Sequence, residues 1–264
     1  METQTENFRL FKYVPPERID VLENEKIAFT PPDRFKDPFE FRVGITRGTL
    51  RNQLKEVIAE AELRAELTMP GYKNLSSRQR RKGRKEMFRK QNVSNEFQEA
   101  FQKSVQTHSW QLGILCLCEA NDSNLMWYHY ADGHKGFVME LDCKHESIIG
   151  LGKPWKVDYL EKPPAFDHTK PTPEIFRFKP SYLKYEAERR ILRQLNEFIL
   201  GKDKDGLPLY FWQLPREGLK AVYIGHRMEP KVRKRIIELL KGQRTQMFNV
   251  VPSRQDYTFT FQQF

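Results

Sequence analysis

The chain has 264 residues, enough for one large domain or a domain with an insertion, and it carries a formal net charge of +10. No apolar run approaches the roughly 20 residues of a membrane-spanning helix, and the residues from Met1 to Glu6 lack the basic and apolar parts of an export signal. We therefore exclude a membrane partner, expect a folded cytoplasmic protein, and infer from its positive charge a polyanionic partner.

The beginning of the chain predicts a compact unit of two strands and a helix. Residues 8–14 alternate like a strand that two prolines stop, residues 17–24 can form a short helix, and residues 26–30 form a second strand. The loop 33–41 interleaves acidic and aromatic residues. We expect this unit to hold a planar ligand.

A long charged stretch from residue 48 to residue 107 has few strand-forming residues and predicts a basic helical insertion. The catalytic core then consists of residues 1–47 and 108–264. Within the insertion, the segment 78–90 is strongly basic and holds a single acid, Glu86. A solvated helix face is the simpler interpretation, but so large an imbalance favours contact with nucleic acid. The residues predicted to make that contact are Arg78, Arg80, Arg81, Lys82, Arg84 and Lys85.

The continuous apolar run Leu112–Cys118 predicts a buried central strand. It contains Cys116 and Cys118, and with Cys143 alone the three cysteines form no disulfide framework, which fits a reducing cytoplasm. Cys143 and His145 lack a second pair of ligands at a usable spacing, so we predict no metal site.

A helical turn is predicted at residues 125–132 and a strand at residues 137–142. His134 lies between Gly133 and Gly136 at the entrance of that strand. Side chains at such a position commonly face a cleft, which makes His134 a candidate site residue. A lone histidine is more often structural or solvated, and that alternative stays open at this point.

The remaining elements are mostly strands. We predict strands at 155–160, 218–225 and 257–261, a solvated turn at 201–206, and a basic amphipathic helix at 231–241. Because the strands are separated by irregular lengths, the fold class predicted is α+β with a mixed sheet.

Two glutamates, Glu186 and Glu188, stand one residue apart before an apolar run. If the segment 185–192 is a strand, its two-residue period places both acids and Arg190 on one face. Like charges so close need a cation or a shared proton between them, which suggests a site for a polar ligand. The alternative is a helix over 180–198, in which the acids are solvated and pair with nearby arginines.

Four segments resemble a bacterial family known as domain of unknown function 2971. Lys36 departs from that family, which usually has asparagine there. The order of elements is also similar to that of ADP-ribosyltransferases, especially those that modify nucleic acids. The segments that carry the resemblance are residues 10–13, 35–40, 126–137 and 185–190.

The second resemblance implies an ADP-ribosyltransferase-like mixed β-sheet core with a helical insertion, which uses NAD as its substrate. It implies that Glu188 is catalytic and that Glu186 assists the acceptor. Lys12 stands where such enzymes usually have histidine or arginine. No Gly-x-Gly-x-x-Gly motif is present, which argues against a Rossmann site. The predicted catalytic residues are Glu188, Glu186, His134 and Tyr130, and those predicted to contact NAD are Lys12, Tyr13, Phe35, Asp37, Trp127 and Arg190.

These features predict a mono-ADP-ribosyltransferase that modifies RNA or single-stranded DNA. The resemblance implies a toxin of a toxin-antitoxin or anti-phage defence system, with an antitoxin protein as partner. Breaking the bond between nicotinamide and ribose develops positive charge on the sugar, and a fixed carboxylate stabilises that charge. Two alternatives are an NAD glycohydrolase with water as acceptor, and a nucleic-acid-binding module without catalysis.

Overall fold

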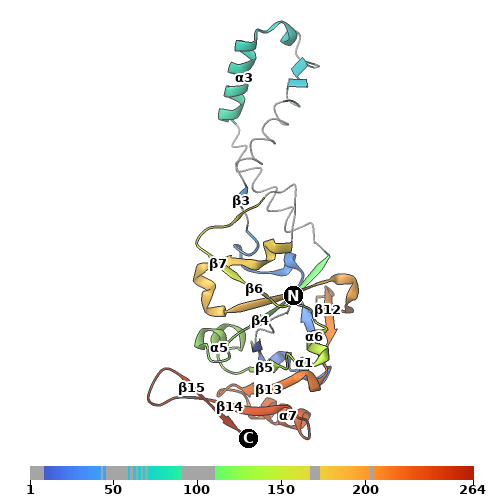
Figure 1. Ribbon diagram of the computed structural model, residues 1–264, viewed down its shortest axis with the longest axis vertical. Coiled ribbons are helices and arrows are strands. Elements are labelled where there is room, and N and C mark those ends of the chain that lie inside the picture. Colours follow the sequence, from blue (N-terminus) through green and yellow to red (C-terminus); the bar gives the residue numbers. More distant parts are fainter. Residues whose placement is uncertain are drawn as a thin grey trace, which may run out of the picture.

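The computed structural model describes residues 9–42, 44–45, 71–90, 111–166, 173–202 and 205–264, with isolated positions between 59 and 68. Its centre is an eight-stranded sheet with the order β15-β14-β13-β5-β1-β4-β10-β6 (Figure 1). The pair β13–β14 is parallel and the other pairs are antiparallel, so the predicted α+β class with a mixed sheet is confirmed. The strands are β1 (Leu10–Val14), β4 (Leu112–Cys118), β5 (Phe137–Leu141), β6 (Trp155–Lys156), β10 (Glu188–Gln194), β13 (Leu219–Ile224), β14 (Gln246–Pro252) and β15 (Phe259–Gln263).

Smaller sheets surround the central one. One has the order β11-β12-β2, one joins β3 to β8, and one joins β7 to β9. Their bounds are β2 (Lys26–Phe29), β3 (Gly44–Ile45), β7 (Asp158–Leu160), β8 (Ala165–Phe166), β9 (Phe178–Pro180), β11 (Ile199–Lys202) and β12 (Pro208–Gln213). The helices are α1 (Asp20–Glu23), α3 (Ser77–Lys90), α5 (Asn124–Tyr130), α6 (Glu146–Ile149) and α7 (Pro230–Leu240).

The central sheet is covered on both faces, because its inner strands are apolar at successive positions. All five residues of β5 are buried. On one face, Leu10 and Leu115 pack in the same cluster as Ile236 of α7. On the other face, Phe11 packs in the same cluster as Trp127 of α5. Burial on both faces explains why β4 and β5 read as continuous apolar runs rather than as alternating ones.

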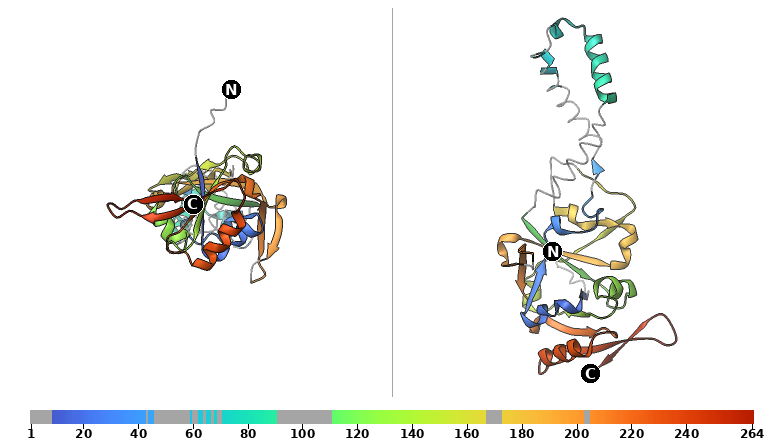
Figure 2. Two further views of the ribbon diagram at one scale, coloured as in Figure 1. Left: turned by 90° about the horizontal axis from the view of Figure 1, so that it is seen from below. Right: turned by 180° about the vertical axis from the view of Figure 1, so that it is seen from behind.

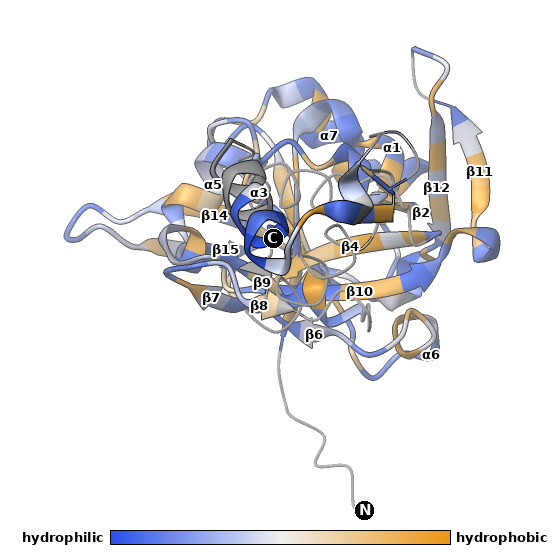
Figure 3. Ribbon diagram, turned by 90° about the horizontal axis from the view of Figure 1, so that it is seen from above, coloured by the Kyte–Doolittle hydropathy of each residue, from blue (hydrophilic) through white to orange (hydrophobic). Residues whose placement is uncertain are grey.

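Helix α3 lies apart from the sheet, beyond the short strand β3 (Figures 1 and 2). It is strongly hydrophilic, in contrast to the apolar stretches of β4 and β10 (Figure 3). Most of the segment 48–107, which we predicted as an insertion, lies outside the described residues.

The acidic segment forms a strand rather than the alternative helix over 180–198. Strand β10 pairs with β4 along seven positions, from Glu188 opposite Cys118 to Gln194 opposite Leu112. The strand begins at Glu188, three residues later than the predicted segment 185–192. Residues Ser181–Glu186 form a 3-10 helix, and Ala187 has a φ of 43°, so Glu186 reaches the site from a turn.

Other boundaries also differ from the predictions. The strand predicted over 155–160 is divided at Val157 between β6 and β7, which belong to different sheets. The segment 201–206, predicted as a turn, begins within β11, and β12 and β14 were not predicted. Strand β11 is mostly exposed, so no alternation of buried and exposed positions marks it in the sequence.

The central sheet opens between β1 and β4. Strand β1 pairs with β5 along all five of its residues, but with β4 at a single position, Phe11 opposite Cys118. Beyond that pair, the Lys12 ammonium donates a hydrogen bond to the Cys116 carbonyl oxygen at 2.9 Å. A side chain thus spans the gap where the backbone ladder would continue, and the separation makes room for a cleft inside the sheet.

Candidate functional site

Two neighbouring cavities lie along the C-terminal half of β1. The first, the acid cleft, has a volume of about 300 Å³, and the second, the outer cleft, has about 590 Å³. Both are lined by Lys12, Tyr13 and Tyr130, so they meet at these side chains. The acid cleft is also lined by Phe35, Asp37, Glu40, Cys116, Lys179, Glu186 and Glu188. Seven of the ten residues predicted to be catalytic or to contact NAD therefore gather around one opening in the sheet.

The acid cleft is built around Lys179, whose ammonium lies between the two predicted acids. It donates to Glu188 Oε2 at 2.8 Å and to Glu186 Oε2 at 2.5 Å. A third carboxylate, that of Glu40, lies 3.6 Å from the same nitrogen. The Tyr130 hydroxyl donates to Glu186 Oε1 at 2.5 Å. Lys179 is thus the cation that so close a pair of carboxylates requires.

Arg190 forms the floor of this cluster. Its Nε donates to Glu188 Oε1 at 2.7 Å, and another nitrogen binds Glu40. The third contact is to the Phe176 carbonyl oxygen at 2.7 Å. The side chain has no exposed surface. We predicted that Arg190 contacts a dinucleotide, but the structure places it behind Glu188, which it orients.

Burial and charge determine the protonation of the cluster. Burial raises the pKa of Glu188, but Arg190 and Lys179 lower it more, so that it lies at about 2. Burial lowers the pKa of Lys179, but Glu188 and Glu40 raise it by more than burial lowers it. The lysine therefore stays protonated. Burial raises the pKa of Glu40, and its cationic neighbours offset only part of that rise. Glu188 is therefore a fixed anion at neutral pH.

Lys12 and Tyr13 form the wall that the two clefts share. Burial lowers the pKa of Lys12, although Cys116 and Glu188 offset part of that fall. The Tyr13 hydroxyl donates to the Ala120 carbonyl oxygen at 3.0 Å, and its ring meets that of Trp127 edge to face at 5.5 Å. The first strand thus supplies an amino group and an aromatic ring to the opening.

The loop after β2 also lines the acid cleft. The Phe35 ring meets Phe41 edge to face at 4.9 Å, and the Arg190 guanidinium lies 5.7 Å from the centre of the Phe35 ring. Asp37 accepts a hydrogen bond from the Phe39 amide at 2.8 Å, which shapes the turn. Phe35 and Asp37 both line the acid cleft, so this loop borders a cavity.

Trp127 and His134 do not line either cleft, although we predicted both at the site. The Trp127 side chain is fully buried, and its indole nitrogen donates to the Asn121 carbonyl oxygen at 2.8 Å. The His134 ring stacks on it at 5.8 Å and pairs with Asn124 Oδ1 at 2.9 Å. His134 has a φ of 69°, so the turn between its flanking glycines directs the ring into the core.

The neutral state of His134 predicts a dependence of stability on pH. Burial, His226 and Arg227 lower its pKa to about 4, against about 6.5 in the unfolded chain. The stability that this neutral ring contributes is present above pH 6.5 and is lost as the pH falls through 4. Between pH 7 and about pH 4.5 we expect wild type to lose about 1–2 kcal/mol more stability than His134→Gln does. Urea denaturation at both pH values measures this difference, and parallel losses would contradict it.

Sequence reasoning missed Lys179 and Glu40, and it also missed Tyr159, whose hydroxyl accepts a hydrogen bond from the Glu188 amide at 2.8 Å. Lys179 is in the middle of the three-residue strand β9. A lysine within a strand close to two acids was the one available signal. Glu40 is within the loop 33–41 that we expected to hold a ligand, but no local pattern points to its partner Arg190, which is 150 positions away in the chain.

The predicted nucleic-acid contacts are on α3, apart from the clefts. Arg78, Arg81 and Lys82 are exposed, and Arg80 lies 4.0 Å from Glu66. The side chains of Arg84 and Lys85 lie outside the described residues.

Comparison with protein families, with characterised proteins and with solved structures finds no match. Across the described residues, no helix combines the length and apolar character needed to cross a bilayer. The same part of the chain contains no group of three His, Cys, Asp or Glu side chains placed to hold a metal ion. The geometry of the two clefts therefore carries the functional argument.

Proposed function

We propose that the protein is a mono-ADP-ribosyltransferase, with NAD as its donor substrate and single-stranded nucleic acid, RNA or DNA, as its acceptor. The observation that carries this proposal is the buried carboxylate of Glu188, held ionised by Lys179 and Arg190 at the wall of an open cleft. A fixed negative charge of this kind stabilises a transition state in which positive charge develops on a sugar.

The dimensions and lining of the clefts support a dinucleotide substrate. The volumes of about 300 and 590 Å³ both fall in the range of roughly 300–1,000 Å³ typical of ligand sites. Lys12 lies on their shared wall, where its charge offsets that of a diphosphate. Phe35 and Tyr13 offer aromatic rings for a nicotinamide or an adenine. We assign the nicotinamide ribose to the acid cleft because Glu188 lines it.

In the proposed reaction, the bond between ribose C1′ and the nicotinamide nitrogen breaks, and its electron pair leaves with neutral nicotinamide. The acceptor atom of the nucleic acid then bonds to C1′ through its own lone pair. Its proton passes to Glu186 and from there to solvent. Glu186 suits this role because the Tyr130 hydroxyl and the Lys179 ammonium orient its two oxygens.

The alternative activity, with water as acceptor, uses the same residues. The test must therefore show which acceptor receives the ADP-ribose. NAD labelled in its adenylate phosphate is incubated with RNA, single-stranded DNA, duplex DNA or protein. We expect label on a single-stranded nucleic acid and release of nicotinamide. Free ADP-ribose without a labelled acceptor indicates a glycohydrolase. Label on protein would show that the acceptor is a protein and not a nucleic acid. If nicotinamide is never released, the enzyme proposal is wrong and a binding module remains.

Glu186→Gln tests the assignment of the acceptor base. We expect this variant to lose about 10²–10⁴-fold in the rate of labelling nucleic acid, the usual contribution of a general base. Nicotinamide release without nucleic acid should fall much less, because Glu188 is retained. Both rates are measured on one preparation by chromatography. Equal losses in both rates would contradict the separate roles of the two acids.

A nucleic-acid-modifying activity of this kind harms the cell that contains it. We therefore extend the proposal to a toxin of a toxin-antitoxin or anti-phage defence system, whose activity a protein partner restrains. Expression of the protein in bacterial cells tests this extension. It is supported if the wild-type chain arrests growth while Glu188→Gln does not.

A further inference from the structure

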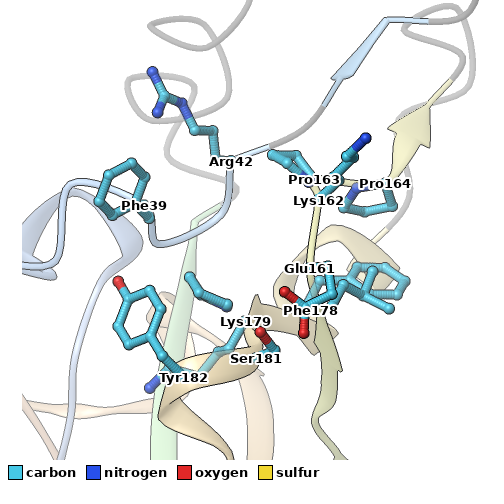
Figure 4. A pocket seen from close by; sticks show the side chains of 12 residues that line it. Phe39, Arg42, Glu161, Lys162, Pro163, Pro164, Phe178, Lys179, Ser181 and Tyr182 are labelled. Carbon is cyan, nitrogen blue, oxygen red and sulfur yellow. The ribbon is translucent and has the colours of Figure 1, made fainter.

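We propose that a third cavity, the aromatic pocket, binds an unpaired base of the nucleic-acid acceptor. This inference rests on the proposed function and specifies its second substrate. The pocket has a volume of about 280 Å³ and shares Lys179 with the acid cleft. Its lining includes Phe39, Arg42, Lys162, Pro163, Phe178 and Tyr182 (Figure 4).

The pocket presents exposed aromatic rings. Tyr182 is 61% exposed and Phe39 is 45% exposed, so both rings are open to solvent. Figure 4 shows both rings on one side of the pocket, with Lys162, Pro163 and Pro164 on the other. Aromatic side chains that line an open slot provide stacking surfaces for any base, whatever its identity.

The rim of the pocket is cationic. Arg42 and Lys162 are both exposed, and among the described residues of the lining Glu161 is the one acidic side chain. The Arg42 guanidinium lies 5.3 Å from the centre of the Phe39 ring, so charge and stacking surface adjoin. A base stacked on these rings would bring its flanking phosphates toward Arg42 and Lys162, which complement their charge.

The pocket lies next to the proposed reaction centre. Tyr182 and Glu186 belong to the same 3-10 helix, Ser181–Glu186. Lys179 lines the pocket, while its ammonium holds Glu186 and Glu188 in the acid cleft. A base in the aromatic pocket therefore lies next to the same lysine that lines the proposed NAD site. This is a suitable position for an acceptor.

The pocket also lies at the end of the molecule that carries α3. Arg42 is two residues before β3 and Pro164 is directly before β8, and these two strands pair. Helix α3 lies beyond β3 in Figure 1 and in the right-hand view of Figure 2. A single strand held by Arg78, Arg81 and Lys82 would approach the pocket from this end. Rings, cationic rim and basic helix together favour nucleic acid over a peptide as the occupant.

The test is equilibrium binding of fluorescein-labelled oligonucleotides, measured by fluorescence anisotropy without NAD. Tyr182→Ala and Phe39→Ala each remove one exposed ring. We expect each to weaken binding of single-stranded RNA or DNA by roughly 5- to 100-fold, the range for loss of one stacked base. The matched control is Tyr257→Ala, because Tyr257 is fully exposed on the hairpin between β14 and β15. It should leave oligonucleotide affinity and NAD turnover unchanged.

Photo-crosslinking identifies the contact directly. An oligonucleotide that contains 5-iodouridine should crosslink to the peptide that carries Tyr182 or to the one that carries Phe39. The inference is overturned if both ring variants bind within twofold of wild type, if crosslinks map to α3 alone, or if NAD labels protein but no nucleic acid. Binding without NAD turnover would instead retain the pocket and reject the transferase.

Discussion

Glu188→Gln is expected to lower the rate of NAD turnover by about 10²–10³-fold, the effect of removing one preorganised electrostatic group from an active site. The amide keeps the size of the side chain and accepts a hydrogen bond from Arg190, but it carries no charge to stabilise the sugar. NAD binding should change much less than the rate, because the charge matters most in the transition state. Nicotinamide release at saturating NAD measures the rate, and a full NAD titration measures the affinity.

The matched control for this variant is Glu119→Gln. Glu119 also pairs with an arginine of β10, since Arg189 Nε donates to it at 2.6 Å, but Glu119 does not line the acid cleft. Glu119→Gln should retain wild-type turnover. Thermal unfolding of both variants shows whether each is folded, since removing one member of a buried ion pair, as Glu188→Gln does, costs about 3–5 kcal/mol. Normal turnover by folded Glu188→Gln would reject the assigned role of this acid.

Lys179→Met is expected to lower the free energy of unfolding by about 3–5 kcal/mol at neutral pH, the usual cost of removing one member of a buried ion pair. The substitution leaves Glu40, Glu186 and Glu188 with Arg190 as the remaining cation of the cluster. Repulsion among these carboxylates raises their pKa values in the folded state. Chemical denaturation in urea measures the change in stability.

The same variant should show a characteristic dependence on pH. A carboxyl group whose pKa is raised by folding contributes stability in acid that is lost as the pH rises through the folded pKa. The deficit of Lys179→Met relative to wild type should therefore be smaller at about pH 5 than at about pH 7.5. A deficit that stays constant with pH would show that Lys179 acts through packing rather than through charge.

Lys220→Met provides the control for a lysine beside a buried acid. Its ammonium lies 3.1 Å from Glu140, but the Lys220 side chain is 54% exposed. Glu140 also keeps Arg9 and Tyr223 as partners. We expect a loss below about 1 kcal/mol, as for exposed ion pairs. If Lys179→Met loses no more free energy of unfolding than Lys220→Met does, the buried cluster in the acid cleft stabilises the fold no more than an exposed ion pair does.

Local patterns in the sequence predicted much of the fold and part of the site. The run Leu112–Cys118 predicted β4 with its observed bounds, because a strand buried on both faces must be apolar throughout. The alternation from Glu188 to Arg190 placed both side chains on one face, and their hydrogen bond agrees with that prediction. The loop 33–41 was also expected to face a ligand, and Phe35 and Asp37 line the acid cleft.

By itself the sequence determined the buried strands, the pair of acids and the need for a cation between them, since these follow from residue periodicity and from repulsion between neighbouring charges. Only the tertiary structure decided that the cation is Lys179, that Glu40 joins the cluster, and that His134 is directed into the core. The physical reason is distance along the chain. Periodicity reports which side of an element is buried, whereas the partner of a buried charge depends on how distant segments meet. In this protein the distant segments that carry Glu40, Lys179 and Glu188 come together at the cleft where β1 separates from β4.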